Sequence, residues 1–329
     1  MEKFVFFGRS NFQYNGFDSM KILLNDVIGD DDFFYVEPTD SSAYRWLNFF
    51  YLDRVGTAIK KRISVPLRTK AFQQYIQHFN SLSKEDKIYF IFVRHEPWFF
   101  GNAGFLKFLK DQFPKSKLVY LLINVNCYLG IDFDEFCPYF DRVITIDEGD
   151  AEKYGLEFHP FFYSSIEKDD SSIPESDCFY VGNAKGRLDE IIKVFELLSA
   201  NGLKCDFHIV GVPGELQRYK EKINYNKPLD YDDVVCHVKK SKILLEIMQD
   251  GQTSGTLREH EAVIYGKKLL TNNRYVVNRS FYVPENISVF EKAEEIDLEF
   301  ITPQKIITEY PHKDEISPRA LIKYLQDNN

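Results

Sequence analysis

Short, continuously apolar runs alternate with amphipathic segments along this chain, and this alternation constrains its fold more than any other feature. The N-terminal half shows it in KFVFFG (3–8), KIYFIFV (87–93), KLVYLLIN (117–124) and RVITI (142–146), with the amphipathic NAGFLKFLKDQFP (102–114) between two of them. Apolar runs of this length are typical of strands buried on both faces, and apolar residues at helical spacing are typical of covering helices. The pattern therefore predicts an α/β fold built on a parallel sheet.

The alternation pauses at SSIEKDDSSIPES (164–176), which is rich in Ser, Asp and Glu, and then begins again. Further strands are expected in CFYVG (178–182), CDFHIVG (205–211), KILLEIM (242–248) and KKLLTNN (267–273), and helices over 187–202, 231–241, 257–266 and 317–326. We expect an N-terminal domain over residues 1–165, a linker over 166–176 and a C-terminal domain over 177–329 that ends in a terminal helix. In open parallel sheets, ligands bind beyond the carboxyl ends of the strands, so two such domains would face each other across a ligand-binding cleft.

Composition narrows the classes of protein to which the chain can belong. A hydrophobic content of 44% excludes wholesale disorder, and a net charge of −9 disfavours a nucleic-acid binder. The five cysteines form no Cys-x-x-Cys pair, so we expect neither a disulfide framework nor a zinc site, and a reducing cytoplasm fits best. The N-terminus lacks the apolar region of a signal peptide, and no apolar run reaches the roughly 18 residues of a spanning helix. These features predict a cytoplasmic protein.

GQTSGTLREHEAVIYGKKLLTNN (251–273) combines a small-residue loop, a charged helix start and a following strand. Gly255 would let the backbone approach a ligand, and Thr256 can cap the helix or present its hydroxyl. Unpaired amides at a helix start attract anions, and Arg258 adds a charged donor in the first turn. Glu261 lies about one turn further along and could accept hydrogen bonds from ribose hydroxyls. An ordinary βαβ turn with a solvated charged helix is the alternative interpretation.

This segment resembles the donor site of GT-B glycosyltransferases, in which a glutamate followed by alanine, and by glycine four residues later, marks the ribose contact. Glu261, Ala262 and Gly266 match that pattern. The resemblance, closest to spore-maturation and capsule-type branches, implies two Rossmann-like domains. It also implies transfer from a nucleoside diphosphate sugar, UDP-linked by family frequency, to a growing bacterial surface glycan or lipid-linked acceptor. Many retaining members carry a glutamate where Thr253 and Ser254 stand here, so retention or inversion stays open.

Residues 179–211 resemble the opening of the donor-binding domain in the same fold. There a strand ends at Gly182, and a loop with Lys185 and Arg187 precedes a helix. The resemblance implies that Gly182 contacts the donor. It also implies that Lys185, Arg187, Arg258 and the backbone of residues 255–257, including Leu257, neutralise the diphosphate. It implies no cofactor: the nucleotide sugar is a co-substrate. The chain shows no convincing metal motif, because the Asp132-Phe133-Asp134 tripeptide is common by chance.

The N-terminal domain is expected to hold the acceptor. Gly16 lies in a glycine-containing loop after the first strand, where it could contact the donor, and Asp18 follows it. His95 lies in VRHEPWFFGN (93–102) at the end of another strand. An inverting transfer needs a base to deprotonate the acceptor hydroxyl, and we expect His95, or alternatively Asp18, in that role.

Residues 44–72 form a locally basic segment in a chain of net negative charge. Aromatic residues come first, and the stretch 54–72 contains basic but no acidic residues. Such a segment can dock on an anionic membrane surface, which would place the protein on the inner face of the cell membrane, or it can be a solvated face. Two other functions stay open. One is a nucleotide-sugar epimerase or hydrolase on the same fold, and the other is a non-catalytic homologue that scaffolds a polysaccharide assembly complex.

Overall fold

The computed structural model describes residues 2–7, 20–36, 81–93, 103–123, 137–249, 252–302 and 308–328. The chain divides into two compact units. Unit 1 takes its described residues from 1–9, 28–146 and 150–159, and unit 2 takes its described residues from 10–27, 147–149 and 160–329. Each unit is described by itself below.

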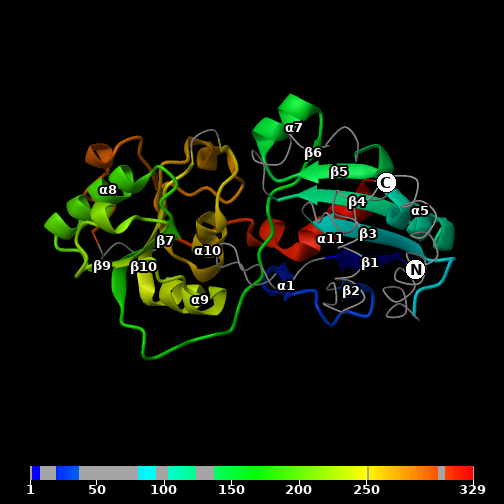
Figure 1. The fold of residues 1–329 in the computed structure, drawn as a ribbon, viewed down its shortest axis with the longest axis horizontal. Coiled ribbons are helices and arrows are strands. Elements are labelled where there is room, and N and C mark those ends of the chain that lie inside the picture. The colour runs from blue at the N-terminus through cyan, green and yellow to red at the C-terminus, as the bar shows by residue number, and fades with distance from the viewer. Residues whose placement is uncertain are drawn as a thin grey trace, which may run out of the picture. The chain divides into compact units, whose positions relative to one another are not determined.

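Unit 1 is built on a parallel sheet of six strands in the order β2-β1-β3-β4-β5-β6 (Figure 1). Its strands are β1 (Glu2–Phe7), β2 (Phe33–Val36), β3 (Lys87–Val93), β4 (Lys117–Leu122), β5 (Arg142–Thr145) and β6 (Glu157–Phe158), and its helices include α5 (Ala103–Gln112), η2 (Cys137–Tyr139) and most of α7 (Glu148–Tyr154). β3 is buried at every position but its first, as its unbroken apolar run predicts. Its Phe90 and Phe92 pack with Leu109 of α5 in the core of the unit.

Unit 2 holds a second parallel sheet of six strands in the order β12-β11-β10-β7-β8-β9 (Figure 1). Its strands are β7 (Ser176–Asn183), β8 (Cys205–Val210), β9 (Ile223–Tyr225), β10 (Ser241–Glu246), β11 (Lys268–Thr271) and β12 (Ile287–Val289). Its helices are α1 (Met20–Leu23), α8 (Leu188–Ala200), η3 (Gly214–Leu216), α9 (Tyr231–Lys240), α10 (Leu257–Tyr265), η4 (Arg274–Asn278), η5 (Ala293–Glu295), η6 (Lys313–Ile316) and α11 (Pro318–Asp327). The predicted α/β class, the two parallel sheets and the terminal helix are confirmed.

The two faces of the second sheet carry different side chains. Phe207 and Ile209 of β8 pack with α8 in the main core of unit 2. Asp206 and His208 alternate with them and therefore point to the opposite face, where α9 supplies His237. α9 and α10 pack on β10 at this opposite face. This alternation separates an apolar layer from a polar one on a single strand.

Each sheet has one position where the chain reverses its direction of strand addition. In unit 2 the chain adds β8 and β9 on one side of β7 and then adds β10, β11 and β12 on the other. The reversal therefore lies between β7 and β10, and in unit 1 it lies between β1 and β3. Ligands of open parallel sheets bind beyond the carboxyl ends of the strands at such switch points. The loops that follow β7 and β10 are thus the first place to look for a site in unit 2.

Candidate functional site

Arg187 bridges the carboxyl ends of the two strands at the switch point of unit 2. Its guanidinium donates to the carbonyl of Asn183 at the end of β7 over 2.5 Å, and to the carbonyl of Ile247, just beyond β10. Its Nε donates to the carbonyl of Ala184 over 3.3 Å. Carbonyls at strand ends lack ladder partners, and the planar fork of an arginine can satisfy several of them at once. The predicted Lys185–Arg187 loop and the chain leaving β10 are therefore joined at this edge of the sheet.

Lys185 lies in this loop with its side chain in solvent. Its φ is 37° and that of Gly186 is 84°, so two successive residues adopt the left-handed region. The amide of Lys185 donates to Oδ1 of Asn183 over 3.1 Å, which holds the turn. A lysine in this region of φ costs free energy, and such backbone strain is concentrated at functional sites. In the part of the chain that the structure describes, the Lys185 ammonium has no acidic partner.

Gly182, a predicted donor contact, lies one position before the end of β7. A Cβ at this position would lie 2.9 Å from the hydroxyl of Tyr180. The packing of Tyr180 therefore explains why a small residue is required at 182, independently of any ligand.

The small-residue loop before α10 is held by two carboxylates of unit 2. Asp147 accepts hydrogen bonds from the hydroxyl of Thr253 at 2.6 Å and from the amide of Ser254 at 2.7 Å. Glu246, at the end of β10, accepts from the amide of Thr256 at 2.7 Å. Thr256 is the N-cap of α10, as predicted, and its hydroxyl accepts from the amide of Arg258 at 3.2 Å. The opposite end of the helix is closed by Gly266 with a φ of 60°.

Two backbone N–H groups near the start of α10 donate no hydrogen bond within the described residues. They belong to Gly255 and Leu257, which flank the N-cap, and neither has a hydrogen-bond acceptor among the residues that the structure describes. Together with the partial positive charge of the helix start, two unpaired amides favour an anion. The prediction that the backbone at residues 255–257 could bind a phosphate is thus compatible with the geometry, although carboxylates already occupy the neighbouring amides.

Arg258 and Glu261 form an ion pair inside unit 2. Two guanidinium nitrogens each lie 2.6 Å from a different oxygen of Glu261, and the hydroxyl of Tyr231 donates to Oε1 over 2.8 Å. The Glu261 side chain is 0% exposed. Burial raises the pKa of Glu261 to about 7, although Arg258 and Tyr231 act to lower it. The carboxylate has no exposed surface for a ribose hydroxyl in this structure, and the predicted ribose contact stays a prediction.

Glu259 is a buried acid that the sequence analysis did not single out. A Cβ at Gly255 would lie 1.4 Å from its Oε2, so its carboxyl group occupies the space that a side chain at Gly255 would need. Burial, followed by the charge of Glu246, raises the pKa of Glu259 to about 8. The glycine predicted for ligand approach is thus required by the packing of Glu259. A sequence signal for this contact exists, because Thr256 followed three residues later by Glu259 is the capping-box pattern, which directs the glutamate back toward the start of the helix.

Several predicted residues lie outside the described residues: Gly16, Asp18, His95 and the basic segment 44–72. The strands that precede the first three are described. β1 ends at Phe7 and β3 at Val93, and the two strands pair in parallel with Phe7 opposite Phe92. By their order in the sequence, Gly16 with Asp18 and His95 follow the two strands at the switch point of unit 1. Among the helices that the structure describes, none has the length and apolar character needed to cross a membrane.

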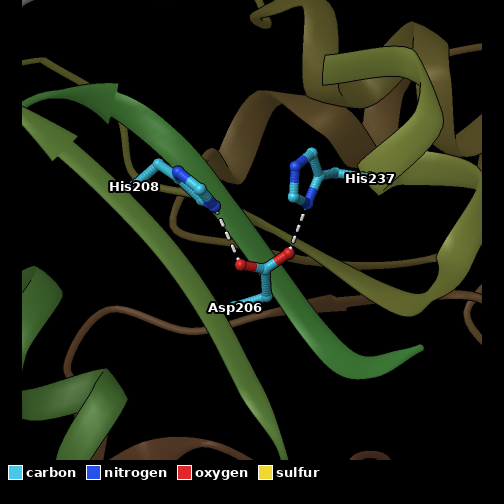
Figure 2. A group of neighbouring side chains, drawn as sticks. All are labelled: Asp206, His208 and His237. Carbon is cyan, nitrogen blue, oxygen red and sulfur yellow. Dashed lines mark hydrogen bonds and ion pairs between the residues drawn. The ribbon is translucent and has the colours of Figure 1, made fainter. Parts of the chain in front are cut away.

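Asp206, His208 and His237 form a second polar cluster, for which the sequence analysis predicted no metal site. Figure 2 shows the carboxylate of Asp206 between the two imidazoles, at 2.8 Å from Nε2 of His208 and 2.6 Å from Nδ1 of His237. The signal that could have found part of it is the Asp-x-His spacing, because residues two apart on a strand share a face. The third member comes from a helix 29 residues after His208 and carries no such signal.

Comparison with solved structures shows the fold. MnaA of S. aureus, solved together with UDP, aligns over 99% of this chain and 97% of its own, with a TM-score of 0.50 and 11% identity. MurG of Acinetobacter baumannii and the glycosyltransferase SnogD of Streptomyces nogalater align with TM-scores of 0.42 and 0.41, at 10% identity each and over 99% of this chain. They are covered over 99% and 95% of their own chains. No family model and no curated protein matches the sequence.

Proposed function

Starting from the GT-B fold of this chain, we propose that unit 2 binds a nucleoside diphosphate sugar at its switch point and that the protein transfers the sugar to an acceptor. The observation that carries the proposal is the Arg187 bridge between the ends of β7 and β10. It joins the exposed Lys185 loop to the loop with the unpaired Gly255 and Leu257 amides. MnaA, which shares the fold, was solved with UDP, and this supports a nucleotide as the ligand.

The diphosphate is the part of the donor that these residues suit. Lys185 supplies a solvent-exposed ammonium, and the Gly255 and Leu257 amides supply fixed dipoles at the start of α10. Arg187 uses three of its five N–H groups on carbonyls, which leaves two for a phosphate oxygen. Positive charge held here would stabilise the negative charge that develops on a departing nucleoside diphosphate. No metal ion is required in this scheme, because protein groups neutralise the leaving group.

The remaining roles in the proposal rest on sequence alone. His95, or alternatively Asp18, would act as base, Gly16 would contact the donor, and Glu261 would hold the ribose. The acceptor would be a growing surface glycan or a lipid-linked sugar, and the basic segment 44–72 would bring the protein to the inner face of the membrane. UDP is the nucleotide to test first, and the cytoplasm is the proposed location.

The first experiment is a calorimetric titration of the full chain with UDP, GDP, dTDP, ADP and CMP. Lys185→Ala is the informative variant, because its side chain is exposed and its loss leaves the core intact. We expect it to weaken binding of the preferred nucleotide about tenfold, or ~1.4 kcal/mol. Lys204→Ala is the matched control, since Lys204 is also exposed but lies before β8, at the opposite edge of the same sheet. Absence of binding by all five nucleotides to folded wild-type protein would contradict the proposal.

Turnover separates transfer from the rival functions. A transferase consumes the matching nucleotide sugar only when an acceptor is present, whereas an epimerase or hydrolase changes the donor alone. Binding without turnover under either condition would favour the scaffolding homologue. One observation favours the scaffolding homologue. Thr253 stands where many retaining relatives carry a glutamate, and its hydroxyl donates a hydrogen bond to Asp147 over 2.6 Å.

A further inference from the structure

We propose that Asp206, His208 and His237 bind a divalent transition-metal ion, with Zn²⁺ as the first candidate. The three side chains offer two imidazole nitrogens and a carboxylate oxygen, and these ligand atoms all lie within 4.8 Å of one another (Figure 2). Imidazole with carboxylate is a common ligand set for Zn²⁺, and three protein ligands leave a fourth position for water. This inference is independent of the proposed function.

The cluster is assembled by two regular elements and is not a chance meeting of surface loops. Asp206 and His208 are two residues apart on β8, so both point to the face of the sheet that α9 covers. His237 lies in the last turn of α9. Its ring stacks on Phe179 of β7, with the centroids 5.3 Å apart and the planes within 10°. A ring held between a helix and a strand in this way is oriented before any ion arrives.

The three side chains must rotate to bring their ligand atoms onto one ion. Two ligand atoms on a tetrahedral Zn²⁺, at about 2.0–2.1 Å each, are roughly 3.3 Å apart. The Asp206–His208 and Asp206–His237 contacts are now 2.8 and 2.6 Å. These two contacts reach different oxygens of Asp206, Oδ1 from His208 and Oδ2 from His237, so each nitrogen would move about half to three-quarters of an ångström away from its oxygen. The ligand atoms spread over up to 4.8 Å, so the most distant pair would have to approach by up to about 1.5 Å. The partial exposure of the Asp206 and His237 side chains leaves room for this rotation, and the ion would replace the two hydrogen-bonded protons.

Charge and access also suit a cation. Asp206 contributes a carboxylate, which adds a negative charge to two imidazole ligands that bind a metal ion in their neutral form. The side chains of Asp206 and His237 are 19% and 13% exposed, which gives an ion a path from solvent. One feature limits affinity: Nδ1 of His208 is buried and has no hydrogen-bond partner among the described residues. Metal-bound histidines bond through their second nitrogen, and the lack of that bond weakens binding about 10–100-fold relative to a site that has it.

The ion would act as a cross-link between α9 and β8. Asp206 is four residues from Val210, the end of β8, which is about 13 Å of strand. The site is therefore separate from the carboxyl edge at which the nucleotide is proposed to bind. The expected effect of the ion is a more stable unit 2, and no part of the proposed transfer reaction depends on it.

The test is a titration of the metal-stripped full chain with Zn²⁺ and with Co²⁺, which reports its ligand geometry through visible absorption. We expect one ion per chain, an intense tetrahedral Co²⁺ spectrum and a higher melting temperature with Zn²⁺. Asp206→Asn, His208→Gln and His237→Gln should each weaken binding at least tenfold and abolish the thermal shift. His312→Gln is the matched control, because His312 is exposed and pairs with Glu315 at 2.9 Å, in η6 and not in the cluster. Unchanged binding in the three cluster variants would overturn the proposal.

A second measurement needs no variant and so does not depend on whether the variants fold. X-ray absorption of Zn²⁺-loaded wild-type protein should show two imidazole ligands. A shell of water and carboxylate oxygens, or no stoichiometric binding at micromolar Zn²⁺, would mean that the cluster is a hydrogen-bonded triad only.

Discussion

The carboxyl group of Glu259 fills the space beside Gly255: a Cβ at Gly255 would lie 1.4 Å from Oε2 of Glu259. Glu259 is 1% exposed and lies in the first turn of α10, so it has little freedom to move aside. The loop that precedes α10 and the first turn of the helix are therefore packed as one piece. This relationship gives the glycine a structural role that can be tested without any ligand.

Gly255→Ala should lower the free energy of unfolding by about 1–3 kcal/mol, the usual cost of overpacking. In the Glu259→Ala background the same substitution should cost much less, because the space is then open. Urea unfolding of the four proteins in this double-mutant cycle measures the coupling. Gly214→Ala is the control: its Cβ would meet no atom within 4 Å, and its φ is outside the left-handed region. Equal costs of Gly255→Ala in both backgrounds would contradict the packing argument.

The pH dependence of stability should report the same residue. Burial raises the pKa of Glu259 from 4.5 to about 8, so between these values the folded protein holds a proton that the unfolded chain releases. Stability due to this group is therefore lost as pH rises, by about 1.4 kcal/mol per pH unit. Glu261, with a pKa of about 7, acts in the same direction below pH 7. His260 acts in the opposite direction, because burial lowers its pKa from 6.5 to about 4.

Between about pH 7 and about pH 8, Glu259 dominates the pH dependence of stability among these three neighbours, because the pKa values of Glu261 and His260 lie at or below 7. Between pH 7 and pH 8, the free energy of unfolding of the wild type should fall by roughly 1 kcal/mol more than that of Glu259→Gln, whose side chain is neutral at every pH. Urea midpoints at half-unit steps of pH measure the difference. Glu215→Gln, at an exposed position of η3, should follow the wild type. Parallel curves for wild type and Glu259→Gln would show that Glu259 titrates normally.

The sequence predicts those features of the structure that depend on residues close together in the chain. Continuous apolar runs predicted the buried strands, and Thr256 and Gly266 predicted the ends of α10, because these signals act within a few residues. The short strands β2, β6, β9 and β12 were not predicted, since two to four residues carry little periodicity. The contacts of Asp147 with Thr253 and of Glu261 with Tyr231 could not be predicted either. They depend on which distant segments meet, as when Asp147 accepts from Thr253, 106 residues later in the chain.

Glu261→Ala should destabilise the protein strongly, by about 3–5 kcal/mol, because it leaves the buried Arg258 guanidinium without its counter-ion. Arg258→Met combined with Glu261→Leu should be more stable than the single variant, since it removes both buried charges and keeps the volume. Thermal unfolding compares the two. A Glu261→Ala protein as stable as the wild type would contradict the buried pair.

The double variant also makes the ribose prediction testable. Loss of nucleotide binding by Glu261→Ala alone could reflect unfolding, whereas the double variant is expected to fold. If the folded double variant binds nucleotide as tightly as the wild type, the role of Glu261 is the ion pair with Arg258. If it loses at least tenfold in affinity while Lys204→Ala does not, the Arg258–Glu261 pair contributes to nucleotide binding, through the ribose predicted for Glu261 or the diphosphate predicted for Arg258.

Arg187→Lys should weaken the carboxyl edge of the second sheet. A lysine ammonium is a point charge, and it cannot repeat the fork by which Arg187 reaches the carbonyls of Asn183, Ala184 and Ile247. At least one carbonyl loses its partner, which costs about 1–3 kcal/mol if it stays buried. Hydrogen exchange should then show faster opening of the segments that follow β7 and β10. Arg218→Lys is the control, because Arg218 and its partner Asp189 are 47% and 88% exposed, and exposed pairs contribute little. Unchanged exchange at both segments in Arg187→Lys would mean that the bridge does not hold the two strand ends together.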